Sequence, residues 1–142
     1  MTANRDRNRQ ILLVSRPIGA PTAENFRLVE TDKPQPAEGE LLLRTIYLSL
    51  DPYMRGRMSD RASYAEPAPL NQPMLGGTVS RVEISRHPDF KEGDWVLAYS
   101  GWQDYAISDG TGLTPLGPQP ENPSYALGIM GMPGFTAYMG LL

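Results

Sequence analysis

Short apolar segments separated by polar stretches rich in glycine and proline make up most of this chain. The segments QILLVS (10–15) and NFRLVET (25–31) have the length and composition of β-strands, with a glycine- and proline-containing loop between them. In LLLRTIYLSL (41–50) both alternating faces are largely apolar. This pattern predicts a third strand that is covered on both sides.

The apolar pattern continues as predicted strands up to about residue 120. In GGTVSRVEIS (76–85) the pattern slips between Val79 and Val82, which predicts a β-bulge. A turn at EGD precedes a buried strand in FKEGDWVLAY (90–99), and the next two segments are expected to continue the meander. The sequence therefore predicts a mainly β domain over residues 10–120.

The last twenty residues have a different pattern, which predicts helices. Asn122 before Pro123 suits a helix start, and a second helix is expected to begin near Pro133, where the first turn tolerates proline. Apolar residues then recur at i, i+3, i+4 and i+7, the spacing of one helix face, namely Phe135, Tyr138, Met139 and Leu142. The chain ends without a capping glycine or a polar tail, so this face is expected to need a partner.

Composition narrows the class of protein. With 142 residues, 14 glycines and 14 prolines, the chain suits one domain of short strands and turns. A net charge of −3 argues against a nucleic-acid surface. The apolar run ILLV after Arg9 is too short for a signal peptide or a membrane span, so we expect a cytoplasmic protein without a membrane partner.

Residue types also limit the chemistry. The sequence has no cysteine, which excludes disulfides, thiolate zinc sites and a cysteine nucleophile. His87 is the one histidine, and a single histidine cannot build a histidine-rich metal site. No metal is therefore expected.

The irregular segment 51–73 contains the densest candidate chemistry, because long loops without periodicity are usually functional. Tyr53 follows Asp-Pro and is expected to project from this loop, where its phenol can donate a hydrogen bond to a carbonyl oxygen that gains negative charge. Alternatively, Tyr53 plugs the mouth of a barrel. Arg55, Arg57 and Arg61 either attract an anionic ligand or belong to a solvated basic loop.

The segment GMPG (131–134) predicts a close corner between two helices. Thr136 lies in the first turn of the last helix, where its hydroxyl either caps that turn or binds the amide of a ligand. Neither G-x-G-x-x-G opening a helix nor a P-loop motif occurs in the sequence. A phosphate-binding loop is therefore absent from these residues.

Four segments together resemble one family: LSLDPYMRGRMSD, GGTVSRV, FKEGDWVLAYSGWQDYAIS and LGIMGMPGFTAYMGLL. They are similar to the N-terminal part of the zinc-independent medium-chain dehydrogenase/reductases of the curcumin reductase, 2-alkenal reductase and prostaglandin (leukotriene B4 dehydrogenase) reductase group. The resemblance implies a GroES-like, distorted β-barrel domain over 1–122. Residues 123–142 would then begin a Rossmann domain, the rest of which this chain lacks.

The resemblance also implies an activity and site residues. Members of this group transfer a hydride from NADPH to the C=C bond of an α,β-unsaturated carbonyl compound, such as an enone or alkenal, without a metal. It assigns Tyr53 to catalysis and substrate binding, with Met54 and Tyr64 as further substrate contacts, and it places Met132 and Thr136 beside the nicotinamide. Because the second domain is missing, the isolated chain is expected to be inactive.

Two alternatives remain open from the sequence. In the first, the chain is a stand-alone GroES-like interaction module with a non-enzymatic partner. The second concerns assembly: two copies form a homodimer through residues 135–142.

Overall fold

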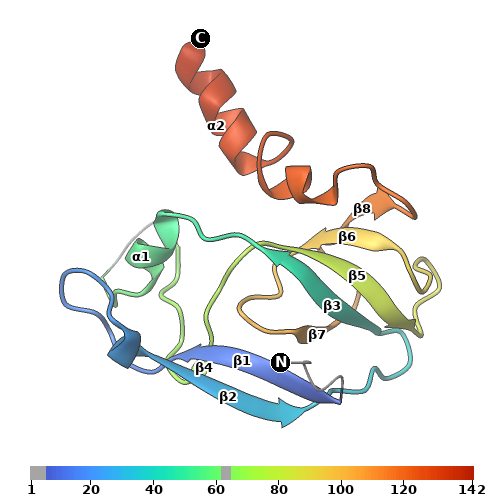
Figure 1. The fold of residues 1–142 in the computed structure, drawn as a ribbon, viewed down its shortest axis with the longest axis horizontal. Coiled ribbons are helices and arrows are strands. Elements are labelled where there is room, and N and C mark those ends of the chain that lie inside the picture. The colour runs from blue at the N-terminus through green and yellow to red at the C-terminus, as the bar shows by residue number, and fades with distance from the viewer. Residues whose placement is uncertain (1–5, 62–64) are drawn as a thin grey trace.

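The chain folds into two antiparallel β-sheets, with short helices at one end and at the C-terminus (Figure 1). The structure is a computed structural model and describes residues 6–61 and 65–142. Its elements, in chain order, are β1 (Arg7–Leu13), η1 (Ala23–Asn25), β2 (Phe26–Asp32), β3 (Leu41–Leu48), α1 (Tyr53–Arg57), β4 (Gln72–Pro73), β5 (Thr78–Ser85), β6 (Trp95–Ala98), β7 (Tyr105–Ser108), β8 (Thr114–Gly117), η2 (Pro123–Leu127) and α2 (Met132–Leu141).

The strand order confirms a mainly β domain but corrects the predicted meander. The smaller sheet has the order β2-β1-β4, and the larger has the order β7-β3-β5-β6-β8. Strand β7 therefore crosses to the far edge and pairs with β3 instead of β6. The meander was predicted from sequential neighbours, and local patterning does not reveal such a crossover.

The prediction that β3 is covered on both sides holds only for its first half. Leu41, Leu42 and Leu43 are fully buried, and they lie between β5 and β7. Ile46 and Tyr47 are 40% and 43% exposed, so the prediction is wrong for the second half. Strand β7 pairs with β3 only as far as Arg44, and the remainder of β3 forms an edge of the sheet.

The predicted irregularity of β5 is present, but the extra residues lie elsewhere. Between the pairs Thr45–Ser80 and Tyr47–Val79, the additional residue is Ile46 on the partner strand. A second additional residue, Glu83, lies on β5 just beyond Val82. Such bulges increase the local bend of a sheet, as closure into a barrel requires.

A buried asparagine joins the two sheets. Asn8 on β1 is 2% exposed, and its side-chain amide donates to the carbonyl oxygen of Tyr105 on β7 at 3.1 Å. In return, the Tyr105 N–H donates to Asn8 Oδ1 at 2.9 Å. The Asn8 side chain therefore bonds to both backbone groups of Tyr105, next to an isolated β-bridge between Gln10 and Gln103.

The segment 101–104 continues this junction with its main chain. Ile11 N donates to Trp102 O at 2.9 Å and Asp104 N donates to Arg9 O at 3.0 Å, while Thr45 N donates to Asp104 O at 2.8 Å. These residues, together with Asn8, bond to both sheets at once. We call this junction the seam.

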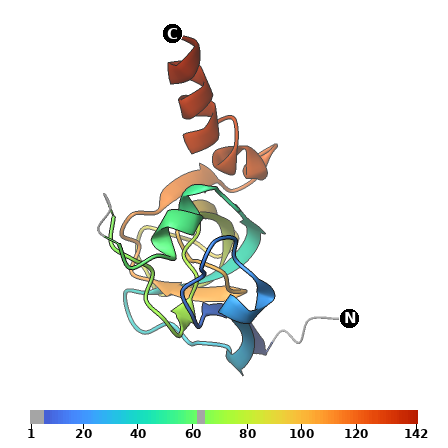
Figure 2. The ribbon, with the colours of Figure 1, turned by 90° about the vertical axis from the view of Figure 1, so that its left-hand side faces the viewer.

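Helix α2 stands away from the two sheets, as both views show (Figures 1 and 2), whereas η2 contacts β5 and β6. Helix α2 begins at Met132, one residue before the predicted start, and ends near the predicted Leu142. The residues of the predicted apolar face are more than half exposed: Phe135 66%, Tyr138 62%, Met139 55% and Leu142 84%. Leu141, outside that face, is 89% exposed, so the helix is apolar on more than one side.

In the described part of the chain, no helix combines the length and apolar character needed to cross a bilayer.

Replacing Asn8 by alanine is expected to lower the free energy of unfolding by about 2–3 kcal/mol, because two buried backbone groups of Tyr105 lose their partner. Urea denaturation measures the change. The control is Asn122→Ala, since Asn122 is exposed and makes no side-chain cap hydrogen bond. Equal stability of the two variants would contradict the role given to Asn8.

The ion pair beside the seam is expected to make stability depend on pH. Burial acts to raise the pKa of Asp104, but hydrogen bonds and charge attraction from Arg9 prevail and hold it below its usual 3.8. A carboxyl whose pKa is lowered by folding stabilises the fold above its unfolded pKa and loses this effect as pH falls through the folded value. Asp104→Asn is therefore expected to cost about 1 kcal/mol at pH 7. The cost should shrink as the pH falls through the lowered pKa of Asp104, and a cost that is constant with pH would contradict this account.

Candidate functional site

An apolar groove of about 790 Å³ lies between the barrel and the C-terminal helices. One wall comes from the segment between β3 and α1, the floor from the start of β5 and the end of β6, and the other wall from η2 and the first turns of α2. Its volume is within the range of small-molecule sites. The residues used below are Asp51, Tyr53, Gly77, Tyr99, Met132 and Thr136.

The first wall is shaped by the sequence Asp51-Pro52. The carbonyl oxygens of these two residues accept hydrogen bonds from Met54 N and Arg55 N, both at 3.1 Å, and these bonds start helix α1. Tyr53 is the first residue of that helix, which corrects the expectation that it projects from a loop. Tyr53 is half-buried: it packs against the hydrophobic core and also lines the groove. The core contacts therefore hold the ring in its orientation.

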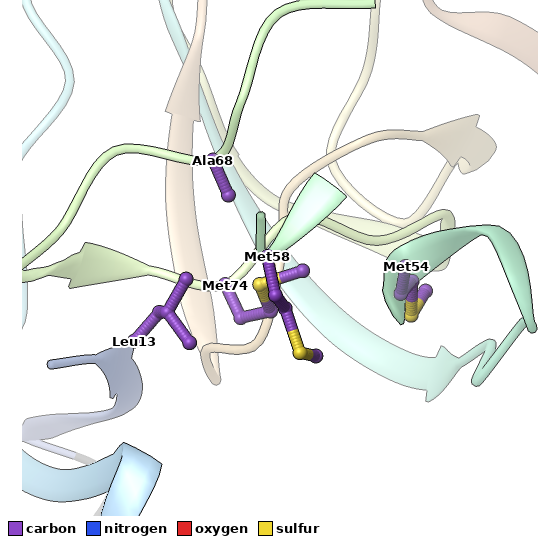
Figure 3. Close-up of a cluster of buried hydrophobic side chains, with 5 residues drawn as sticks. All are labelled: Leu13, Met54, Met58, Ala68 and Met74. Carbon is purple, nitrogen blue, oxygen red and sulfur yellow. The ribbon is translucent and has the colours of Figure 1, made fainter. Parts of the chain in front are cut away.

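Met54 occupies a different position from the one expected of a substrate contact. It is 3% exposed and belongs to a core cluster with Leu13, Met58, Ala68 and Met74 (Figure 3). Met54 is absent from the groove lining. In this placement its side chain supports α1 from inside the barrel.

The arginines near α1 bind main-chain oxygens. Arg55 donates to Gly19 O at 2.9 Å and to Pro17 O at 3.1 Å, and Arg57 donates to Glu66 O at 2.6 Å. Arg57 also lines the groove, so anion attraction stays open for it, and the exposed Arg61 agrees with the solvated alternative. The two guanidinium groups fasten neighbouring loops to α1, while Arg61 is exposed.

The second wall depends on the glycines of the GMPG corner. A Cβ at Gly131 would lie 2.1 Å from Ala126 O, and one at Gly134 would lie 1.8 Å from Ile129 O. Both positions therefore exclude any side chain, as the predicted close corner requires. The corner directs Met132 and Thr136 to the groove.

The structure thus brings together three of the five site residues expected from the sequence. Tyr53 lies on one wall, and Met132 and Thr136 lie on the other, about eighty residues later in the chain. Among the described residues, no hydrogen bond caps the first turn of α2 from a side chain, so the capping alternative for Thr136 has no support. Tyr64 lies outside the described residues.

Gly77 and Tyr99 are among the groove residues that the sequence does not predict. Both line the floor, and the Tyr99 side chain is 75% exposed. The sequence places the glycine pair 76–77 at the start of the predicted strand 76–85 and in a segment that carries the family resemblance, and not in a binding site. The sequence predicts Tyr99 within the buried strand 90–99, and its exposure directly after β6 corrects that prediction.

Metal ligands do not gather in the described residues, 6–61 and 65–142. No group of three or more histidine, cysteine, aspartate or glutamate side chains lies close enough together there to hold a metal ion.

The fold and the groove define a class of protein: a β-barrel domain beside an apolar groove whose volume is that of small-molecule sites. Residues 9–116 match the family described as the N-terminal domain of oxidoreductases, and the chain belongs to that family. The barrel is of the GroES-like type expected from the sequence.

Particular relatives confirm the resemblance to the curcumin and prostaglandin reductases. The chain is 63% identical to the NADPH-dependent curcumin reductase of Escherichia coli (strain K12) over 142 residues, which are 100% of this chain and 41% of the relative. It is 43% identical to prostaglandin reductase 1 of Mus musculus over 127 residues, 87% of this chain and 36% of the relative.

A solved structure agrees with these sequence matches. The crystal structure of CurA from Vibrio vulnificus in complex with NADPH matches with a TM-score of 0.89 and 69% identity, over 94% of this chain and 40% of that chain. The chain therefore spans about two fifths of the length of these relatives.

Arg55→Ala is expected to lower stability by about 1–2 kcal/mol, because the loop at residues 17–19 loses two hydrogen bonds that fasten it to α1. Hydrogen exchange should show faster exchange in α1 and in this loop, with the seam unchanged. The control is Arg61→Ala, which removes an exposed arginine nearby. Unchanged exchange in α1 would show that Arg55 does not fasten the loop.

Proposed function

We propose that this chain is the substrate-side domain of an NADPH-dependent oxidoreductase that reduces the C=C bond of α,β-unsaturated carbonyl compounds. The observation that supports it most is that Tyr53 lies on one wall of an apolar groove and Met132 and Thr136 lie on the other. The relatives named as NADPH-dependent or prostaglandin reductases support the same class of reaction. The proposal includes the cytoplasm as the location, where reduced dinucleotide is available.

In the proposed role, Tyr53 would act on the carbonyl oxygen of the substrate. When a conjugated carbonyl compound accepts a hydride at its β-carbon, the electron pair of the C=C bond moves toward the oxygen and an enolate forms. A phenol that donates a hydrogen bond to this oxygen stabilises the negative charge as it develops. The enolate then takes a proton at the α-carbon, which gives the saturated carbonyl product.

The described residues fit one end of the cofactor. NADPH, when bound, supplies the hydride. Met132 offers an apolar contact for a flat ring, and the Thr136 hydroxyl offers a hydrogen bond to a carboxamide, both on the wall that faces Tyr53. The sequence contains no glycine-rich phosphate loop, so these residues would hold only the nicotinamide end.

The domain division forms part of the proposal. Residues 1–122 would constitute the GroES-like domain, and residues 123–142 would begin the nucleotide-binding domain. The large exposed fractions of the apolar side chains on α2 support a covering partner. The same exposure favours a second candidate, a stand-alone barrel module that dimerises through residues 135–142. Light scattering tests this dimer, because a dimer that Met139→Asp converts to a monomer would support it, and a monomer in both proteins would remove it.

The proposed function is tested with the protein expressed from the complete reading frame that contains these residues. We expect NADPH oxidation with a conjugated enone, no oxidation with the matching saturated ketone, and a saturated ketone as the product. The 142-residue chain alone is expected to show no turnover. Steady turnover by that chain, or an allylic alcohol as the product, would contradict the proposal.

Tyr53→Phe is expected to lower kcat by about 100-fold with little change in KM, since the lost hydrogen bond acts mainly on the developing charge. The control is Tyr47→Phe, because Tyr47 lies on β3 outside the groove lining. Unchanged kcat in Tyr53→Phe would remove Tyr53 from the mechanism.

A further inference from the structure

Gly77 is a glycine for which the fold has no evident need. Its φ lies outside the left-handed region, and the nearest atom to a Cβ placed there is 3.4 Å away, an ordinary van der Waals distance. Gly101 contrasts with it, since it has a φ of +75° and a Cβ there would lie 2.6 Å from Met74 O. Backbone strain and close packing therefore explain Gly101 but not Gly77.

The side that Gly77 leaves empty faces the groove. The atoms nearest to a Cβ at this position are Leu127 Cδ2 at 3.4 Å and Tyr99 Cε1 at 3.7 Å. Both residues line the groove, as does Gly77 itself. Any side chain larger than a methyl group at this position would extend between these two residues and reduce the space for a ligand.

The main chain at this position is held firmly. Gly77 O accepts a hydrogen bond from Ser49 N at 2.9 Å. Its neighbour Gly76 is tightly enclosed, since a Cβ there would lie 3.1 Å from both Leu48 Cδ1 and Trp102 Nε1. The backbone therefore has little freedom to retreat from an added side chain.

We propose that Gly77 is a specificity-determining position, whose missing side chain leaves room on the groove floor for a bulky substituent of a conjugated carbonyl substrate. The inference rests on the proposed function. Tyr99 indicates which kind of substituent fits there, because this residue is 75% exposed and its ring borders the backbone of Gly77. An exposed tyrosine ring suits contact with an aromatic group. A side chain at position 77 is therefore expected to hinder aryl-substituted enones more than short 2-alkenals.

The test compares two substrates in the protein from the complete reading frame, 4-phenylbut-3-en-2-one and a short 2-alkenal. Gly77→Val is expected to lower kcat/KM for the aryl enone by at least 10-fold and to change the value for the alkenal by less than about 3-fold. Gly77→Ala should shift the ratio in the same direction by a smaller factor, and its melting temperature should match the wild type. Gly56→Ala is the control, since Gly56 lies in α1 with open space around its Cβ position.

Each outcome decides the inference. A ratio that falls in both Gly77 variants and stays constant in Gly56→Ala supports it. An unchanged ratio with intact turnover overturns the role of Gly77 and leaves the proposed function standing. A large loss of melting temperature in Gly77→Ala would also overturn it, because the glycine would then be required by the fold. Absence of turnover with both substrates in the wild type overturns the proposed function together with this inference.

Discussion

The seam between the two sheets is the constraint on which the rest of the structure depends. The three-stranded sheet and the five-stranded sheet share no strand, so regular strand pairing does not join them. Hydrogen bonds from Asn8 and from the segment 101–104 join them instead. Buried backbone groups need partners, and the seam supplies them at the place where regular strand pairing stops.

The seam also positions the floor of the groove. Trp102 N donates to Met74 O at 2.8 Å and Gly101 N donates to Gly76 O at 3.2 Å, so the segment 74–77 lies directly on the seam. On its other side, Ser49 bonds to Gly77 and leads into α1 with Tyr53. The floor and the first wall thus form one hydrogen-bonded unit. The second wall is carried by α2, whose apolar side chains are largely exposed.

Features that depend on local sequence were predictable, and those that depend on distant hydrogen bonds were not. Apolar segments gave the strands, and the glycines of GMPG gave the helix corner, because a Cβ there is excluded by atoms only five residues away. The crossover of β7 and the exposure of Ile46 depend on which strand lies beside β3, information that hydrophobic spacing does not contain.

The same division holds for the candidate site. Tyr53, Met132 and Thr136 were accessible through the family resemblance. Met54 shares the motif of Tyr53, yet one step along a helix turns its side chain from the groove into the core. Gly77 and Tyr99 become visible as groove residues only when strands β5 and β6 are placed side by side.

The most direct test of the central claim, that a conjugated carbonyl compound binds in this groove, is a crystal structure of the whole protein with oxidised cofactor and an unreactive aryl ketone. The account predicts the ketone oxygen at about 2.7 Å from the Tyr53 hydroxyl, with the aryl group over Gly77. A ketone bound outside the groove, or with its oxygen directed away from Tyr53, would contradict the account.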